Sequence, residues 1–329
     1  MLGIIANPAS GKDIRRLISG ASVFDNQEKR NIVRRAVLGA VAAGERSFRY
    51  LPDGHGIARS AIEEAAPGCD VSPVDIPLTD SALDTARGAE RMRDAGCGAV
   101  LVLGGDGTNR AAALGWLDLP VVAVSTGTNN VFPEMVEGTL AGIAGALVAL
   151  GRVRLDQAAC QAKVVHLKIE GERDDLALID AALVAGPFLG ARAVWEPSSL
   201  KAAVLTRAEP ASVGLSSIGA FLSPLPAERD AALHLVIGEG GVIVTAPIAP
   251  GLLARVPVRE HRRLVLGEEV VFNGPGVLAL DGERERRLVP GQRVRLQVRR
   301  DGPRVIDVAR ALSVAACDGL FVEGGQDGH

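Results

Sequence analysis

The sequence predicts an α/β domain with a parallel sheet, followed by an all-β, sandwich-like domain. Three observations lead to this fold class. Over about the first 150 residues, short apolar runs alternate with helix-like stretches, which is the βα pattern. The clearest of these runs are continuously apolar, as in strands of a parallel sheet that is covered on both faces. After residue 151 the long helical periodicities become scarce, and short β-like runs are separated by glycine, proline and charged residues.

Each element of the first half is supported by its own local pattern. Gly44 and Gly96 are placed to end helices whose apolar residues keep helical spacing. The two most apolar strands lead into glycine or small polar residues, at the edge of the sheet where ligands gather in α/β folds. The expected elements are a strand at 2–8, a helix at 27–43, a strand at 46–52, helices near 56–66 and 80–95, and strands at 99–105 and 120–126.

The second half contains seven short β-like runs and then returns to helical character. The runs are AKVVHLKIEG, LALIDAALVAG, ALHLVIG, GVIVTAPI, EEVVFNG, GVLALDG and QRVRLQVRR. Near the end, VIDVARALSVAACDGLFV regains helical spacing, and we expect it to fold back onto the first half. The sequence therefore predicts an α/β domain at 1–150, a β-rich domain at 151–308 and a returning C-terminal segment at 309–329.

The composition restricts the function classes. The 329 residues carry a formal net charge of −3, with 23% charged and 47% hydrophobic residues, so there is no global attraction to nucleic acid or anionic membranes. Aromatic residues make up 3%, few for the stacking platforms of single-strand binders. The four cysteines are scattered without CxxC spacing, and no apolar run reaches the roughly 18 residues of a membrane span. We expect a cytoplasmic protein with neither nucleic acid nor membrane as partner.

The stretch LVLGGDGTNR, residues 101–110, is the most informative motif. One interpretation is a tight strand-to-helix turn in which Thr108 or Asp106 caps the helix. The other is an anion cradle, in which glycine N–H groups and a helix N-terminus face a phosphate and Asp106 serves a metal or a hydroxyl. The motif has neither the GxGxxG spacing of dinucleotide folds nor the GxxxxGK of P-loops.

A strand followed by GGDGT resembles the signature of the NAD kinase, diacylglycerol kinase and phosphofructokinase-like group. Other motifs fall in the order that this group carries them, so the resemblance spans nearly the whole chain. They are NPASGK (7–12), GGDGT (104–108), STGTNNVFP (125–133), LALIDAALV (176–184), VTAPIAPGLLARVPV (244–258) and LALDGERE (278–285). Through STGTNNVFPEMVEGT the chain is particularly similar to the acetoin-catabolism protein X-like branch of the NAD kinases.

The resemblance implies a cleft between the two domains and a phosphoryl-transfer reaction. Such a reaction requires positioned phosphates, Mg²⁺ and a carboxylate that orients or deprotonates an acceptor hydroxyl. Asp106 is the implied catalytic carboxylate and metal ligand. The residues implied to bind phosphates or nucleotide are Asn7, Gly104, Gly105, Gly107, Thr108, Thr126, Gly127, Thr128, Asn129 and Asn130.

Two segments of the second half complete the implied site. Asp180 stands where NAD kinases carry the glutamate of an Asn-Glu pair, with Ile179 in place of the asparagine. Asp281-Gly282-Glu283 has two interpretations. It is a β-hairpin turn, which Asp-Gly favours, or Asp281 contacts the nucleotide and Glu283 supplies a catalytic carboxylate opposite Asp106, as a similar motif does in lipid kinases.

The resemblance therefore implies an ATP-dependent kinase that uses Mg²⁺ and phosphorylates a small-molecule hydroxyl, with NAD(H) as the first acceptor and formation of NADP as the result. Two alternatives stay open. One is a lipid or small-alcohol kinase of the same fold, and the other is a non-catalytic, nucleotide-binding regulatory protein. The family also implies a homo-oligomer, a dimer or tetramer formed through the β domain.

Overall fold

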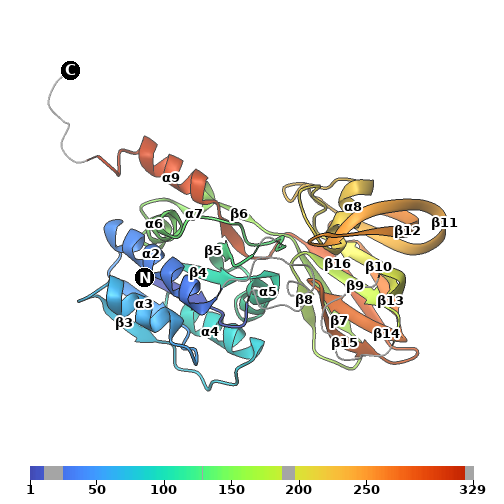
Figure 1. The fold of residues 1–329 in the computed structure, drawn as a ribbon, viewed down its shortest axis with the longest axis horizontal. Coiled ribbons are helices and arrows are strands. Elements are labelled where there is room, and N and C mark those ends of the chain that lie inside the picture. Colours follow the sequence, from blue (N-terminus) through green and yellow to red (C-terminus); the bar gives the residue numbers. More distant parts are fainter. Residues whose placement is uncertain (11–24, 128, 187–196, 323–329) are drawn as a thin grey trace.

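The computed structural model describes residues 1–10, 25–127, 129–186 and 197–322. It has two lobes, an α/β lobe from the first half of the chain and a β-rich lobe from the second (Figure 1). The predicted fold class is confirmed, with a mostly parallel sheet in the first lobe and antiparallel sheets in the second.

The first lobe follows the predicted alternation of strands and helices. Its elements are β1 (Leu2–Ala6), α2 (Asn26–Ala42), β2 (Ser47–Tyr50), α3 (Ile57–Ala65), β3 (Asp70–Pro73), α4 (Ala82–Asp94), β4 (Ala99–Gly104), α5 (Asp106–Gly115), β5 (Pro120–Ser125), α6 (Gly138–Ala149) and α7 (Leu155–Ala158). Strands β1, β4 and β5 are buried along their whole length, as their continuous apolar sequences predict.

The order of the strands places two motifs side by side. The first sheet runs β3-β2-β1-β4-β5-β17-β6, and β1 pairs in parallel with both β2 and β4. Helices α2, α3 and α6 pack on one face of this sheet, whereas α4 and α5 pack on the other. The strand order thus reverses between β1 and β4, and ligands bind outside the carboxyl ends of strands at such a switch point. Asn7 follows β1 there, and Gly105 follows β4.

The second lobe is a pair of antiparallel sheets with one helix against the larger sheet. Its elements are β7 (Val164–Ile169), β8 (Asp175–Ala177), β9 (Asp180–Val184), the 3-10 turn η1 (Pro197–Ser199), β10 (Leu200–Leu205), α8 (Leu215–Leu222), β11 (Ala231–Ala249), β12 (Leu252–Val265), β13 (Glu269–Asn273), β14 (Gly276–Leu280), β15 (Glu283–Leu288) and β16 (Arg293–Arg299). The sheets run β12-β11-β10-β9-β14-β15 and β13-β16-β7-β8, and apolar residues of both fill one core.

One stretch of the second lobe differs from the sequence expectation. The runs ALHLVIG and GVIVTAPI were expected as two strands, but both belong to the single 19-residue strand β11. The glycine-rich segment between them forms a bulge, at which the register against β12 shifts between Ile237 and Val242. The glycines therefore bend one strand instead of separating two.

The chain returns to the first lobe at its end. Strands β6 (Ala159–Gln161) and β17 (Arg304–Ile306) pair with each other, and β17 also pairs with β5, so both extend the first sheet. Helix α9 (Val308–Cys317) packs on α6 and α7. The C-terminal helix therefore lies against the first lobe, and the first sheet includes residues 159–161 and 304–306, which belong to the stretch expected as the β-rich domain.

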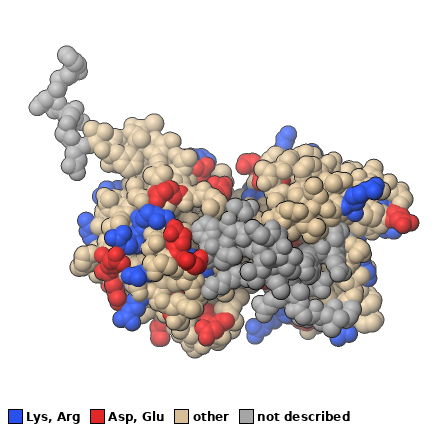
Figure 2. Space-filling view, in the orientation of Figure 1, with Lys and Arg blue, Asp and Glu red and all other residues tan. Residues whose placement is uncertain are grey.

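The surface of the first lobe carries charges of both signs. Figure 2 shows lysine and arginine side chains interspersed with aspartate and glutamate over this lobe, in keeping with the small net charge of −3. Among the helices that the structure describes, none is long and apolar enough to cross a membrane.

Candidate active site

A pocket of about 1100 Å³ lies between the two lobes. The first lobe contributes the loops after β1, β2 and β4, a segment before α4, and the loop after β5. The second lobe contributes the start of β9, the N-terminal end of α8, and the turn between β14 and β15. The sequence-predicted residues that line it are Asn7, Gly105, Asp106, Gly107, Thr108, Asn129, Asn130, Asp180, Asp281 and Glu283.

Three predicted residues do not line the pocket, namely Gly104, Thr126 and Gly127. Each comes shortly before residues of the chain that do. A Cβ on Gly104 would lie 2.5 Å from the Thr108 side chain, so this glycine allows the first turn of α5 to approach β4. Thr126 is fully buried. Thr128 lies outside the described residues.

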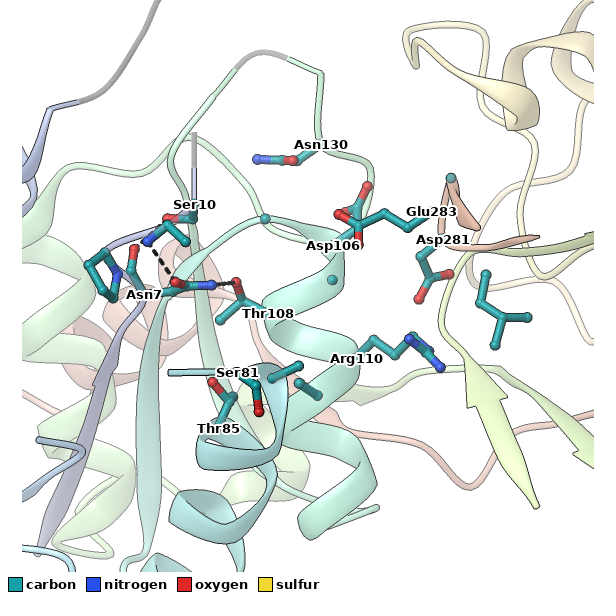
Figure 3. A pocket seen from close by; sticks show the side chains of 18 of the residues that line it. Asn7, Ser10, Ser81, Thr85, Asp106, Thr108, Arg110, Asn130, Asp281 and Glu283 are labelled. Atoms are coloured by element: carbon teal, nitrogen blue, oxygen red, sulfur yellow. Dashed lines mark hydrogen bonds between the residues drawn. The ribbon is translucent and has the colours of Figure 1, made fainter. Parts of the chain in front are cut away.

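The loop after β1 is fastened to the start of α5. Asn7 Nδ2 donates a hydrogen bond of 2.9 Å to Thr108 Oγ1 (Figure 3). The Asn7 amide donates to the Leu103 carbonyl. The Asn7 side chain also accepts from the amide of Ala9, which makes the loop turn on itself. The two predicted phosphate motifs are therefore one connected surface.

Lys29 of α2 holds this loop by hydrogen bonds, and the sequence did not predict a role for it. Its side chain, on α2, is fully buried, and Nζ donates to the carbonyls of Asn7, Pro8 and Ser10 at 2.6–3.1 Å. A buried ammonium is stable only when its donors are satisfied. The sequence holds one signal for it, because Lys29 lies four residues before Val33, on the apolar face of the helix.

The N-terminus of α5 opens into the pocket. Gly105 is the residue before the helix, and no side chain caps it. The first N–H groups of a helix have no partner within the helix and carry its positive dipole end, so they attract anions. A Cβ on Gly105 would lie 2.9 Å from Asn130 Oδ1, so a larger residue would displace the Asn130 side chain. This end of the helix can attract an anion such as phosphate.

The carboxylate of Asp106 is oriented by backbone donors. Oδ1 accepts from the amides of Val131 and Phe132 at 3.0 and 2.8 Å, and Oδ2 accepts from Val131 at 3.2 Å. Each carboxylate oxygen accepts more than one hydrogen bond. Asp106 is therefore fixed at the pocket.

The loop after β5 is held by a second set of hydrogen bonds. Ser125 Oγ donates to the Gly127 carbonyl at 2.6 Å and accepts from Asn130 Nδ2 at 2.7 Å. Asn129 Oδ1 is buried and has no hydrogen-bond partner among the described residues. Since Asn129 lines the pocket, it is available to a donor group of a ligand.

Asp281 forms the hairpin turn that the Asp-Gly pair predicts, and its side chain also binds a second segment of the chain. It and Gly282, between β14 and β15, both have positive φ, 50° and 79°. Its buried carboxylate accepts from the amides of Leu178, Ile179 and Asp180 at 2.7–3.2 Å. Burial raises the pKa of Asp281 to about 6, although these amides and the charge of Arg110 favour the ionised form. Asp281 thus fastens the turn to the start of β9.

Glu283 reaches across the pocket to the first lobe. A Cβ placed on Gly107 would lie 3.7 Å from Glu283 Oε1, which puts this carboxylate beside the first turn of α5. Figure 3 shows Glu283 extending from the β14–β15 turn toward Asp106. The structure therefore brings together the two acids that were predicted to face each other.

The rest of the second-lobe wall combines one acid with aliphatic groups. Asp180, at the start of β9, is buried and lines the pocket. Ser216 and the N-terminal end of α8 lie on the same wall. The aliphatic residues of this wall are Val213, Leu215, Ile248 and Leu280. The wall can accept hydrogen bonds from hydroxyl groups and can pack against an alkyl body.

Arg110 is the second functional residue that the sequence did not predict. It lines the pocket one helical turn after Asp106, and its guanidinium makes a buried ion pair of 2.6 Å with Asp175 of the other lobe. Among the described residues, no group of three or more His, Cys, Asp or Glu side chains could hold a metal ion alone.

Comparison with known proteins identifies both halves of the chain. Residues 2–153 match the family model of the ATP-NAD kinase N-terminal domain, and residues 163–301 match the acetoin catabolism protein X C-terminal domain. Acetoin catabolism protein X of Cupriavidus necator is 38% identical over 327 residues, which cover 95% of this chain and 91% of that protein. The resemblance expected from the motifs is confirmed.

Solved structures share the fold at low sequence identity. Yeast NADH kinase complexed with NADH superposes with a TM-score of 0.52 at 14% identity, and the match covers 100% of this chain and 90% of the other. A putative diacylglycerol kinase from Bacillus anthracis str. Sterne gives a TM-score of 0.47 at 13% identity, covering 90% and 94%. The match to the NADH kinase shows that the two-lobed fold is the same.

Proposed function

We propose, because this chain belongs to the acetoin catabolism protein X family, that it is an ATP-dependent kinase acting on a hydroxyl of a small molecule. One observation carries the proposal. The pocket joins a phosphate cradle, at Asn7–Ser10 and Gly105–Thr108, to two carboxylates, Asp106 and Glu283, that come from opposite lobes. Phosphoryl transfer requires these parts and little covalent chemistry from the protein.

The residues present fit both ATP and Mg²⁺. The N-terminal turn of α5, Gly105–Thr108, would hold the phosphates, since it offers the N–H groups of a helix N-terminus, and the loop Asn7–Ser10 would lie beside them. Mg²⁺ is usually bound by one or two carboxylates together with substrate phosphates, and Asp106 would be its protein ligand. The metal would neutralise charge on the phosphates.

The carboxylates have separate roles in this proposal. The amides of Val131 and Phe132 fix the orientation of Asp106, the proposed metal ligand. Glu283 stands on the wall that carries Asp180 and the aliphatic residues, where an acceptor would lie. We assign to Glu283 the removal of the proton from the acceptor hydroxyl, and to Asp180 a hydrogen bond from a neighbouring hydroxyl.

NAD(H) is the first acceptor that we propose, since residues 2–153 match the ATP-NAD kinase N-terminal domain. The second candidate is a small aliphatic alcohol. It is favoured by the wall of Val213, Leu215, Ile248 and Leu280, which offers packing surface for an alkyl group. The name of the 38% identical relative refers to acetoin, a small hydroxyketone.

The test is an incubation of the purified chain with ATP, Mg²⁺ and either NAD⁺ or NADH. Formation of NADP(H) supports the first acceptor. Release of ADP only with small diols or hydroxyketones supports the second. Nucleotide binding measured by calorimetry, with no ATP consumed for any acceptor, contradicts the kinase proposal and favours a regulatory nucleotide-binding protein.

A further inference from the structure

A chain of charged contacts connects the two lobes behind the catalytic carboxylates. Arg110 of α5 donates from Nη2 to Asp175 Oδ1 at 2.6 Å, and from Nε to the Leu176 carbonyl at 2.6 Å. The Arg110 and Asp175 side chains are only 9% and 4% exposed. Figure 3 shows Arg110 pointing from α5 toward the second lobe, on the side of Asp281.

The same aspartate continues the contact to the strand that carries Glu283. Asp175 Oδ2 accepts from Arg286 Nη2 at 3.2 Å, and Arg286 lies three residues after Glu283 on β15. Arg286 also pairs with Glu172 at 3.3 Å. One oxygen of Asp175 therefore binds the helix that begins at Asp106, and the other binds the strand that begins at Glu283.

Stability alone is a weak explanation for this arrangement. Removing two charges from water costs about as much as their attraction returns, and apolar residues of similar size often stabilise a core equally well. An arginine that donates two hydrogen bonds to the same segment does, however, fix the direction and the distance of that segment relative to its own helix. Arg110 is also close enough to the β14–β15 turn that its charge opposes the rise in the pKa of Asp281.

We propose that Arg110, Asp175 and Arg286 are positioning residues that hold the Asp106 and Glu283 carboxylates at their working separation across the pocket. The inference rests on the proposed kinase function. Catalysis by two groups on different lobes depends on their relative placement, and a misplacement of about 1 Å can cost roughly a hundredfold in rate. The three residues thus affect kcat through the two carboxylates that they position. Two of them, Asp175 and Arg286, do so without touching the substrate.

Arg286→Gln tests the proposal with little risk to the fold. Arg286 is 35% exposed and is not among the residues that line the pocket. We expect kcat to fall about tenfold, with the KM for ATP within about twofold, because the phosphate cradle lies wholly in the first lobe. Arg286→Lys keeps the charge and is expected to restore most of kcat.

The matched control is Arg287→Gln, at the exposed neighbouring position of the same strand. It removes the same charge from β15 without touching Asp175, and we expect kcat and KM to stay unchanged. If Arg286→Gln keeps kcat within twofold of the unchanged protein, or if Arg287→Gln lowers it equally, the positioning role is wrong although the kinase function stands.

If the protein phosphorylates no acceptor, the proposed function is contradicted. The Arg110–Asp175–Arg286 bridge between the lobes is then tested by measuring the distance between the two lobes. Spin labels on Glu90→Cys of α4 and Glu269→Cys of β13, both exposed positions, report the separation of the lobes. The background replaces Cys69, Cys160 and Cys317 with serine. A broader or shifted distance distribution for Arg286→Gln than for Arg287→Gln supports the bridge, and identical distributions overturn it.

Discussion

The two walls of the pocket are made of different chemical groups. The first-lobe wall contains the N-terminal end of α5, whose first N–H groups have no partner within the helix, together with polar side chains such as Asn7 and Asp106. The second-lobe wall carries the carboxyls of Asp180 and Glu283 beside aliphatic residues. The N–H groups of a helix N-terminus attract phosphate, whereas carboxylates accept hydrogen bonds from hydroxyl groups and repel anions. This difference supports the proposed placement of the donor phosphates at α5 and of the acceptor hydroxyl at the second wall.

Asp106→Asn is the strongest test, because Asp106 is the carboxylate at the N-terminus of α5 and the proposed Mg²⁺ ligand. We expect kcat to fall at least about a thousandfold, since a bound metal supplies several kcal/mol of transition-state charge stabilisation. The asparagine oxygen can still accept from the amides of Val131 and Phe132, so the melting temperature should change little. Steady-state kinetics and thermal unfolding measure the two effects.

The control for this variant is Asp80→Asn. Asp80 is an exposed acid at the same pocket, with a φ of 53° that asparagine also tolerates. We expect its activity to match that of the unchanged protein. An Asp106→Asn protein with full activity would rule out the proposed role of this carboxylate and leave the first wall as a binding surface only.

Asp281 on the second wall makes the free energy of unfolding depend on pH. Its pKa is raised from 3.8 to about 6 in the folded protein, mainly by burial. The folded state therefore holds this proton more tightly, so the stabilisation is complete below pH 4 and is lost as the pH rises through 6. The difference in pKa corresponds to about 3 kcal/mol of unfolding free energy.

Urea unfolding of the unchanged protein and of Asp281→Asn, at several pH values between 4 and 7, measures this contribution. Asparagine does not titrate, so the difference between the two proteins should depend on pH in this window. We expect the unchanged protein to lose its advantage over the variant as the pH rises. A constant difference from pH 4 to 7 would show that Asp281 has an ordinary pKa.

Glu283→Gln tests whether the second wall takes part in the reaction. We expect kcat to fall about a hundredfold with little change in the KM for ATP, because Glu283 is assigned to the acceptor hydroxyl and not to the phosphates. A loss of less than about threefold would leave Glu283 as the first residue of a hairpin strand.

The first wall could be predicted from the sequence because its motifs are contiguous. NPASGK and GGDGT each follow a buried strand, and parallel pairing of β1 with β4 brings their ends together. The second wall was predictable only in part. Asp-Gly predicted the hairpin turn at 281–282, but the bonds from Asp281 to the amides at 178–180 join segments more than 100 residues apart. Local sequence contains no information on such a contact.

The two supporting cations were missed for the same reason. Arg110 pairs with an aspartate 65 residues away, and Lys29 binds carbonyl groups about 20 residues before it. Charged residues on helices usually lie in solvent, so their type argued against burial. Only their position, on the same helix face as apolar or catalytic residues, marked them as exceptions.

Lys29→Met tests whether the shape of the first wall depends on the ammonium beneath it. Methionine keeps the apolar stem but leaves the carbonyls of Asn7, Pro8 and Ser10 without this donor, which costs about 1–3 kcal/mol of stability. We expect a roughly tenfold higher KM for ATP, about 1.4 kcal/mol of binding, with a smaller effect on kcat. Lys168→Met, at an exposed position on β7, is the matched control. A lower melting temperature with an unchanged KM for ATP would mean that Lys29 stabilises the lobe without shaping the phosphate site.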